Sequence, residues 1–224
     1  MRRTMVTLAL AAAVAAVPAV AAQAEGQVKG VDASRYDATF DWGTPGVEFG
    51  FAKASEGERG TDPAFARHWR EMRGNGLVRG AYHYGHPGTD PVREADHFLT
   101  VVRQQGLVQG DLLALDLEVA DGRSVEQVNA WARRWLERVE QQTGVKPFFY
   151  SSWSFAGQYG EGLGEYPLWV AHYGKSKGEV EPPRPWREWV VHQYASTDHD
   201  WNVSRVSPQE LRALGVKAPA PVSP

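Results

Sequence analysis

The sequence predicts an α/β fold in which strands and helices alternate around one parallel sheet, as they do in (β/α) barrels. Three observations lead to this prediction. Short apolar runs rich in strand-forming residues alternate with segments of helical periodicity. Helix-start signals stand between those runs. Polar or aromatic residues stand late in every run, and the late ends of barrel strands meet at one mouth, where barrel enzymes carry their active sites.

Seven apolar runs are predicted to be the strands. They cover residues 28–32, 49–53, 78–84, 112–119, 147–151, 168–172 and 189–194.

Four helices are predicted from the signals that open them. Asp62-Pro63 and Asp90-Pro91 each place an N-cap residue before a proline at the first helical position. The segment 124–127 forms a capping box that opens a long helix to about Gln142. The segment 207–210 repeats this pattern for a last short helix.

The first 24 residues predict a signal peptide that is removed near Ala24. A positive start, an apolar stretch over 5–20 and the motif Ala22-Gln23-Ala24 are typical of exported proteins. A membrane anchor fits less well because Pro18 interrupts the apolar stretch. We therefore expect a secreted domain over residues 25–217, followed by a Pro-rich, disordered tail over 218–224.

Composition excludes some functional classes. The whole chain has a net charge of −3, and loss of Arg2 and Arg3 with the signal makes it more negative, so no basic surface for nucleic acid or an anionic membrane is expected. Without cysteine, an exported domain depends on its core alone. Nine Trp and eight Tyr suit both a core and a carbohydrate cleft, and composition does not separate the two uses. We expect a monomer without cofactor or metal.

The run 112–119 ends with two carboxylates, Asp116 and Glu118, at positions i and i+2. Period-two geometry places both on one strand face, with Cα atoms roughly 6.6 Å apart. Two such acids raise each other's pKa, which suits a site where one carboxyl keeps its proton and the other is ionised. An ion pair with arginine or a helix cap is the structural alternative. The apolar run and the barrel pattern favour catalysis, although a Cα spacing does not decide between inversion and retention.

Two histidine motifs suggest a competing chemistry. His83-x-x-His86 and the segment 198–200 could belong to a metal-dependent carbohydrate deacetylase, if they gathered around one cation. His86-Pro87-Gly88 is a turn, whereas His83 lies near the end of a strand, so we do not expect them to converge. The chain contains neither a G-x-S-x-G motif nor a P-loop.

Several motifs together are similar to those of the glycoside hydrolase family 25 lysozymes, the N-acetylmuramidases. The similarity extends from about Gly30 to about Val206. In chain order the motifs are Gly30-Val31-Asp32-Ala33-Ser34-Arg35-Tyr36 with Asp41-Trp42, Phe51-Ala52-Lys53-Ala54-Ser55-Glu56-Gly57, Asp62-Pro63-x-Phe65, Gly76-Leu77, Gly80-Ala81-Tyr82-His83-Tyr84, Leu115-Asp116-Leu117-Glu118, Leu168-Trp169-Val170-Ala171-x-Tyr173, Gln193-Tyr194 and Asp200-x-Asn202.

This resemblance implies a single-domain, irregular TIM-like (β/α) barrel. It also implies hydrolysis of the β-1,4 bond between N-acetylmuramic acid and N-acetylglucosamine in bacterial peptidoglycan. By the family pattern Glu118 is the general acid/base, and Asp116 stabilises a charged intermediate that the substrate's own acetamido group could form. Asp32 and Asp200 complete the acidic cleft. The expected substrate-binding residues are Tyr82, Tyr150, Trp169 and Tyr173, with Lys53, His83 and Gln193 at the strand ends.

The chain departs from the family pattern at two positions, with Asp37 where glutamine is frequent and His192 where tryptophan is frequent. The short stretch after Tyr194 makes Asp198 a rival for the fourth acid, and Asp200 is preferred because Asn202 follows it at the family spacing. A non-catalytic wall-binding protein with the same fold is an alternative, as is the deacetylase.

Overall fold

The computed structural model of the protein describes residues 27–217. The predicted signal peptide (1–24) and Pro-rich tail (218–224) lie outside the described residues. Among the residues that are described, no helix is both long enough and apolar enough to cross a membrane.

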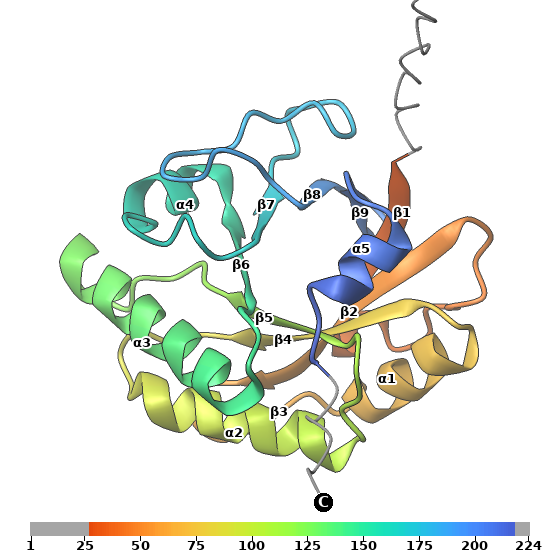
Figure 1. Ribbon diagram of the computed structural model, residues 1–224, viewed down its shortest axis with the longest axis horizontal. Coiled ribbons are helices and arrows are strands. Elements are labelled where there is room, and N and C mark those ends of the chain that lie inside the picture. The colour runs from red at the N-terminus through yellow and green to blue at the C-terminus, as the bar shows by residue number, and fades with distance from the viewer. Residues whose placement is uncertain (1–26, 218–224) are drawn as a thin grey trace, which may run out of the picture.

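Eight strands close into a barrel, and a ninth, β3, extends it as a short hairpin with β2 (Figure 1). Around the barrel the order is β1-β9-β8-β7-β6-β5-β4-β2, and β2 pairs with β1 to close the ring. The strands are β1 (Val28–Ala33), β2 (Val47–Glu56), β3 (Gly60–Thr61), β4 (Val78–Tyr84), β5 (Leu112–Asp116), β6 (Phe148–Ser152), β7 (Leu168–Ala171), β8 (Val191–Ser196) and β9 (Asp200–Ser204).

Strand β9 is antiparallel to both of its neighbours, β1 and β8, whereas the other seven barrel strands are parallel to one another. A three-residue connection, 197–199, joins β8 to β9, and so short a turn only permits a reversal of direction. The first residue of β9 therefore lies at the same mouth as the last residues of the parallel strands. The seven predicted strands are confirmed, while β9 was not predicted.

Helices cover the outside of the barrel and one of its ends (Figure 1). They are η1 (Arg35–Asp37), α1 (Phe65–Gly74), α2 (Pro91–Gln104), α3 (Val125–Thr143), α4 (Trp153–Tyr159) and α5 (Pro208–Ala213). The predicted caps of α2, α3 and α5 are confirmed, because the side chains of Asp90, Ser124 and Ser207 accept hydrogen bonds from the first-turn N–H groups.

The predicted start of the first helix at Asp62-Pro63 is wrong, and α1 begins at Phe65. The Asp62 carboxylate instead accepts hydrogen bonds from the backbone N–H groups of Ala64 (2.8 Å) and Arg35 (3.1 Å). Asp62 thus holds η1 against the segment that leads into α1. Helix α4 was not predicted.

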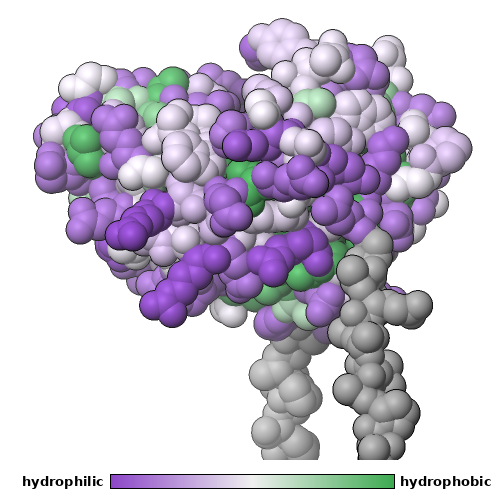
Figure 2. All heavy atoms as spheres, turned by 90° about the horizontal axis from the view of Figure 1, so that it is seen from above, coloured by the Kyte–Doolittle hydropathy of each residue, from purple (hydrophilic) through white to green (hydrophobic). Residues whose placement is uncertain are grey.

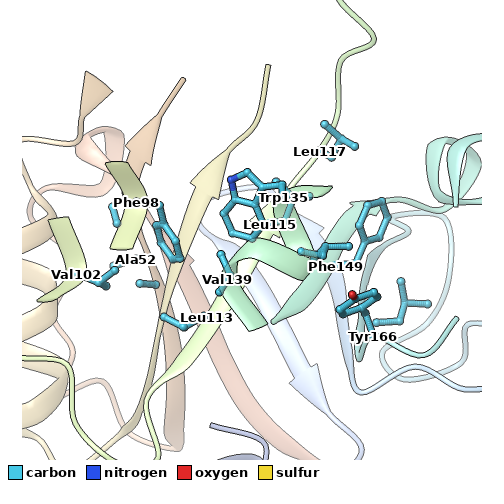
Figure 3. Close-up of a cluster of buried hydrophobic side chains, with 14 of the residues drawn as sticks. Ala52, Phe98, Val102, Leu113, Leu115, Leu117, Trp135, Val139, Phe149 and Tyr166 are labelled. Atoms are coloured by element: carbon cyan, nitrogen blue, oxygen red, sulfur yellow. The ribbon is translucent and has the colours of Figure 1, made fainter. Parts of the chain in front are cut away.

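Two apolar layers hold the barrel together. In the outer layer, Phe98 of α2 and Trp135 and Val139 of α3 pack on the strands (Figure 3). The inner layer fills the barrel with Phe49, Phe51, Phe148 and Trp169, and Leu211 of α5 packs against it from below. The face shown in Figure 2 is mostly hydrophilic, with apolar residues in small separate areas.

Side chains along a strand face the barrel interior and exterior in turn, which explains why polar side chains lie at the barrel mouth. In β2, Phe49 and Phe51 fill the interior and Lys53 continues the same face. In β5, Ala114 fills the interior and Asp116 follows it. The prediction that this strand runs to residue 119 is wrong, because β5 ends at Asp116.

Glycines make room for the inner aromatic rings. A Cβ atom on Gly80 would lie 2.3 Å from Phe51 Cδ1, and one on Gly30 would lie 2.3 Å from Phe49 Cζ. The barrel therefore requires glycine at these two positions, since a methyl group would occupy space that the rings already fill.

Gly80→Ala should lower the free energy of unfolding by about 1–3 kcal/mol, because the added methyl group forces the Phe51 ring out of place. Gly74→Ala is the matched control, since a Cβ atom there meets nothing within 4 Å and alanine favours the helix. Urea unfolding of both variants tests this. Equal stability of the two variants would contradict the packing described here.

Candidate active site

Three aspartates lie where the barrel strands reach the mouth. Asp32 stands next to the end of β1, Asp116 ends β5 and Asp200 begins β9. Asp32 and Asp200 are direct partners in the antiparallel β1–β9 pair. Asp116 and Tyr150 are partners in the β5–β6 pair. The closed sheet therefore places these acids around one opening, and Glu118 stands two residues beyond Asp116.

Asp32 is buried, with its carboxyl group held by amides from β9, which pairs with β1, and from β8, the next strand around the barrel. Its Oδ2 accepts hydrogen bonds from Gln193 Nε2 (2.6 Å) and Asn202 Nδ2 (2.7 Å). Burial, followed by the charge of Asp200, raises its pKa well above the usual value, although both amide hydrogen bonds act in the opposite direction. The carboxyl group thus has a fixed orientation and a reduced tendency to ionise.

Asp200 and Asp198 have different environments. Burial, and then the charges of Asp37 and Glu118, raise the pKa of Asp200 to about 6. Asp198 is exposed, and its Oδ1 accepts hydrogen bonds from Trp201 Nε1 (2.8 Å) and His199 N (3.0 Å), which lower its pKa. Asp198 is occupied in forming the β8–β9 turn, whereas Asp200 lies among the other acids.

Asp116 and Glu118 form a close pair in which one member is buried and the other is exposed. Burial raises the pKa of both, and the charge of Glu118 raises that of Asp116 further. Asp116 Oδ1 is buried and has no hydrogen-bond partner among the described residues.

Lys53 supplies a positive charge to this acidic mouth. Its charge lowers the pKa of both Asp116 and Glu118. Its Nζ lies 2.6 Å from Glu56 Oε2 and 4.8 Å from the centre of the Tyr84 ring. A cavity of about 280 Å³ next to it is lined by Arg35, Lys53, Glu56, Gly60, Thr61 and Asp62.

Tyrosines and Gln193 connect the acids to the rim of the mouth. Tyr150 Oη and Tyr173 Oη both donate to Gln193 Oε1, at 2.8 and 2.6 Å. Gln193 therefore accepts from two tyrosines and donates to Asp32. Tyr173 is 54% exposed, whereas Tyr82 and Tyr150 are buried in the inner layer. Tyr173 alone among these three offers a large surface to a ligand.

Two predicted substrate-binding residues do not face the opening. His83 is fully buried in contact with the outer helices, where Nε2 lies 2.7 Å from Glu94 Oε2 and its ring stacks on Trp135. It follows Tyr82 in the strand and so points to the opposite side of the sheet. Trp169 is 1% exposed, stacks on Phe51 inside the barrel and donates to Asn202 Oδ1 (2.7 Å). Trp169 was predicted to contact the substrate. It instead lies beneath the mouth and supports the residues there.

Three further residues lie at the mouth that were not predicted as site residues. Asn202 bridges Asp32 and Trp169. Asp37 lies 3.2 Å from His199 Nδ1 and contributes to the raised pKa of Asp200. Tyr84 lies close to the acid pair, whose charges add to burial in raising its pKa to about 12. Asn202 and Tyr84 stand within quoted motifs, so the signal for both was present in the sequence.

The two histidines considered for a metal site have different environments, since His83 is buried and His86 lies at the mouth. No group of three or more potential metal ligands occurs in the region covered by residues 27–217. A cavity of about 870 Å³ lies at the other end of the barrel, where Pro167, Leu168 and Val190 precede or begin strands. It is remote from the acids.

Comparisons with known proteins agree with this geometry. A family model described as "Glycosyl hydrolases family 25" matches residues 31–202. The chain is 35% identical over 211 residues to the uncharacterized protein YegX of Escherichia coli K12, covering 85% of this chain and 75% of YegX. It is 30% identical to an N,O-diacetylmuramidase of Arthroderma benhamiae, covering 88% of this chain and 90% of that protein. A crystal structure of the bacterial lysozyme from Streptomyces coelicolor is similar with a TM-score of 0.76, at 26% identity over 85% of this chain and 98% of that one.

Asp200→Asn should increase the free energy of unfolding at pH 8 by about 1–2 kcal/mol. The folded pKa of about 6 is raised above the unfolded value, so ionisation of Asp200 above that pH opposes folding, and the amide removes this effect. At pH 3 the carboxyl group is protonated in both states and the gain should vanish. Urea unfolding at the two pH values measures this.

Asp198→Asn is the matched control. Its carboxylate has a lowered pKa and accepts hydrogen bonds, so the amide should give no gain at pH 8. If the two variants behaved alike, the distinction between Asp198 and Asp200 would be wrong.

Proposed function

The chain belongs to family 25 of the glycosyl hydrolases and is a glycosidase of the lysozyme type, and from that premise we propose that it hydrolyses the β-1,4 bond between N-acetylmuramic acid and N-acetylglucosamine in bacterial peptidoglycan. The observation that carries the proposal is the exposed Glu118 beside a buried Asp116 with an unpaired oxygen. Most glycosidases use a pair of carboxyl groups for catalysis.

Glu118 is the proposed general acid and base. Its carboxyl group is exposed at the mouth, where it can reach the oxygen of a glycosidic bond. Desolvation by the surrounding protein raises the pKa of its carboxyl group, which is the direction that a general acid requires. A sugar in the cleft would displace water and favour the neutral form further. Glu118 then protonates the leaving oxygen and later takes a proton from water.

Asp116 is proposed to orient and stabilise the positive charge that develops at the sugar. Its Oδ1 has no partner among the described residues and can accept a hydrogen bond from the N–H of the 2-acetamido group. That contact would direct the acetamido oxygen towards the anomeric carbon, and a carboxylate beside the resulting ring stabilises its charge. Lys53 balances the negative charge of the pair in the free enzyme.

Asp32 and Asp200 are proposed to form the floor of the cleft. Gln193 and Asn202 fix the orientation of the Asp32 carboxyl group. That group can therefore accept a hydrogen bond from the sugar or the attacking water, or place a negative charge beside it. Asp200, with a pKa of about 6, is mostly ionised at neutral pH and adds negative potential. Tyr173 is the proposed stacking and hydrogen-bonding residue at the rim. Lys53 and Gln193 are also proposed to contact the substrate, with Tyr82 and Tyr150 supporting the site from below.

We propose that the enzyme acts outside the cell, where its proposed substrate lies. We propose that residues 1–24 are the signal peptide, that 25–217 form the catalytic domain, that 218–224 are a tail, and that the protein acts as a secreted monomer on glycan strands. The pattern of the first 24 residues supports secretion.

Glu118→Gln should lower the rate of release of reducing ends from purified peptidoglycan by about 10²–10⁴-fold, because glutamine can neither donate nor accept the proton. The unfolding midpoint should change little, since the side chains are nearly equal in size. Glu137→Gln, on the exposed face of α3, should keep full activity and is the control. Substantial activity in the Glu118 variant would remove the assigned role.

Expression of the full chain in a bacterial host that exports by signal peptides should give a protein in the medium or periplasm that begins near Glu25. Mass spectrometry of the intact exported protein measures this. Retention of residues 1–24 on an exported protein, or absence of export, would contradict the proposed signal.

A further inference from the structure

A chain of polar contacts joins Lys53 to two loops at the barrel mouth. Lys53 Nζ lies 2.6 Å from Glu56 Oε2, and the other oxygen of that carboxylate, Oε1, lies 3.3 Å from His86 Nε2. The second ring nitrogen of His86, Nδ1, lies 3.2 Å from Asp121 Oδ2. His86 therefore connects the end of β2 with the loop that follows β5.

His86 itself is anchored from two further directions. Its backbone N–H donates to the buried Glu94 (3.2 Å to Oε2), which His83 and Thr89 also contact. His83 in turn contacts Ser55 of β2, with 2.8 Å between Nδ1 and Oγ. The His86 ring lies 5.4 Å from the Tyr84 ring.

Asp121 is held as well. Its Oδ2 accepts a hydrogen bond from Gly88 N (3.3 Å), and its backbone has a φ of +47°, which is uncommon for a residue with a side chain. Such a conformation persists where contacts fix it. The charged or titratable groups that face His86 are thus Glu56 from β2, Asp121 from the β5–α3 loop, Glu94 from α2 and Tyr84 at the end of β4.

We infer that His86 is a positioning residue for the proposed reaction, because by holding Glu56 it keeps the ammonium group of Lys53 beside the Asp116–Glu118 pair. Without the imidazole, one carboxylate oxygen of Glu56 loses its partner on the mouth side. The Glu56 side chain, which is partly exposed, then gains rotamers, and Lys53 can follow it away from the acids.

The consequence is measurable at Glu118. The charge of Lys53 lowers the pKa of Glu118, so displacement of Lys53 should raise it. A nearby opposite charge changes a carboxyl pKa by about 1–3 units, and a displaced charge should produce a part of that change. A histidine that only supported the fold would leave Glu118 unaffected.

The experiment follows the Glu118 carboxyl carbon by NMR as pH is raised, with the signal assigned by its absence in Glu118→Gln. His86→Ala should raise the titration midpoint of Glu118 by about 0.5–1 pH unit, and Lys53→Met should raise it by about 1–3 units. His86→Gln should restore a value near that of the unchanged protein, because the glutamine amide can donate to Glu56 from the place of Nε2.

Two further variants make the test specific. The double variant of His86→Ala and Lys53→Met should shift no more than Lys53→Met alone, since the first change acts through the second residue. His97→Ala is the control, because the ring of His97 binds the Gly60 carbonyl oxygen (2.8 Å) and not the Glu56 side chain. His86→Asn, too short to reach Glu56, gives the same test should the alanine variant not fold.

An unchanged Glu118 midpoint in His86→Ala or His86→Asn would overturn the inference, and so would shifts that add in the double variant. The inference rests on the proposed function for its meaning, but the titration needs no substrate. Failure to cut peptidoglycan would therefore refute the proposed function. The Glu118 titration would still show whether His86 positions Lys53.

Discussion

The buried carboxyl group of Asp32 ties together the three strands that complete the barrel. It stands on β1, and it accepts hydrogen bonds from Gln193 of β8 and Asn202 of β9. The reversed direction of β9 makes this possible, because it brings the start of that strand to the mouth where the parallel strands end. Without that reversal, Asp200 would lie at the other end of the barrel from Asp32 and Asp116.

Burying several carboxyl groups in one place opposes folding. Desolvation raises the pKa of Asp32, Asp116, Glu118 and Asp200, and like charges raise those of Asp32, Asp116 and Asp200 further. The fold tolerates this because amides satisfy Asp32, Lys53 offsets the acid pair, and two apolar layers fill the space around them. The same desolvation shifts these pKa values in the direction that the proposed proton transfer requires, so stability and the proposed catalysis place opposite demands on the mouth.

Much of the fold could be read from the sequence because its signals are local. Apolar alternation located the seven parallel strands, and side chains that bond their own helix located the starts of α2, α3 and α5. The two-residue spacing of Asp116 and Glu118 was also local. Strand β9 and helix α4 were missed because the short β9 gains its meaning from closure of the barrel, and the seven-residue α4 from packing on β6 and β7.

The site residues also divide into those that the sequence could identify and those that it could not. His83 was predicted at the site beside Tyr82, although neighbours in a strand face opposite sides, so the sequence held the information to exclude one of them. Trp169 could not be separated from a cleft residue without knowing the width of the barrel interior. The roles of Asn202 and His86 depend on partners about 170 and about 30 residues away, a distance that no local pattern reports.

The most direct measurement of the central claim is mass spectrometry of peptidoglycan fragments released by the purified protein. The proposed acid pair at the mouth of a family 25 barrel predicts fragments that end in reducing N-acetylmuramic acid. Fragments that end in reducing N-acetylglucosamine, or an intact glycan that has lost only acetate, would contradict it.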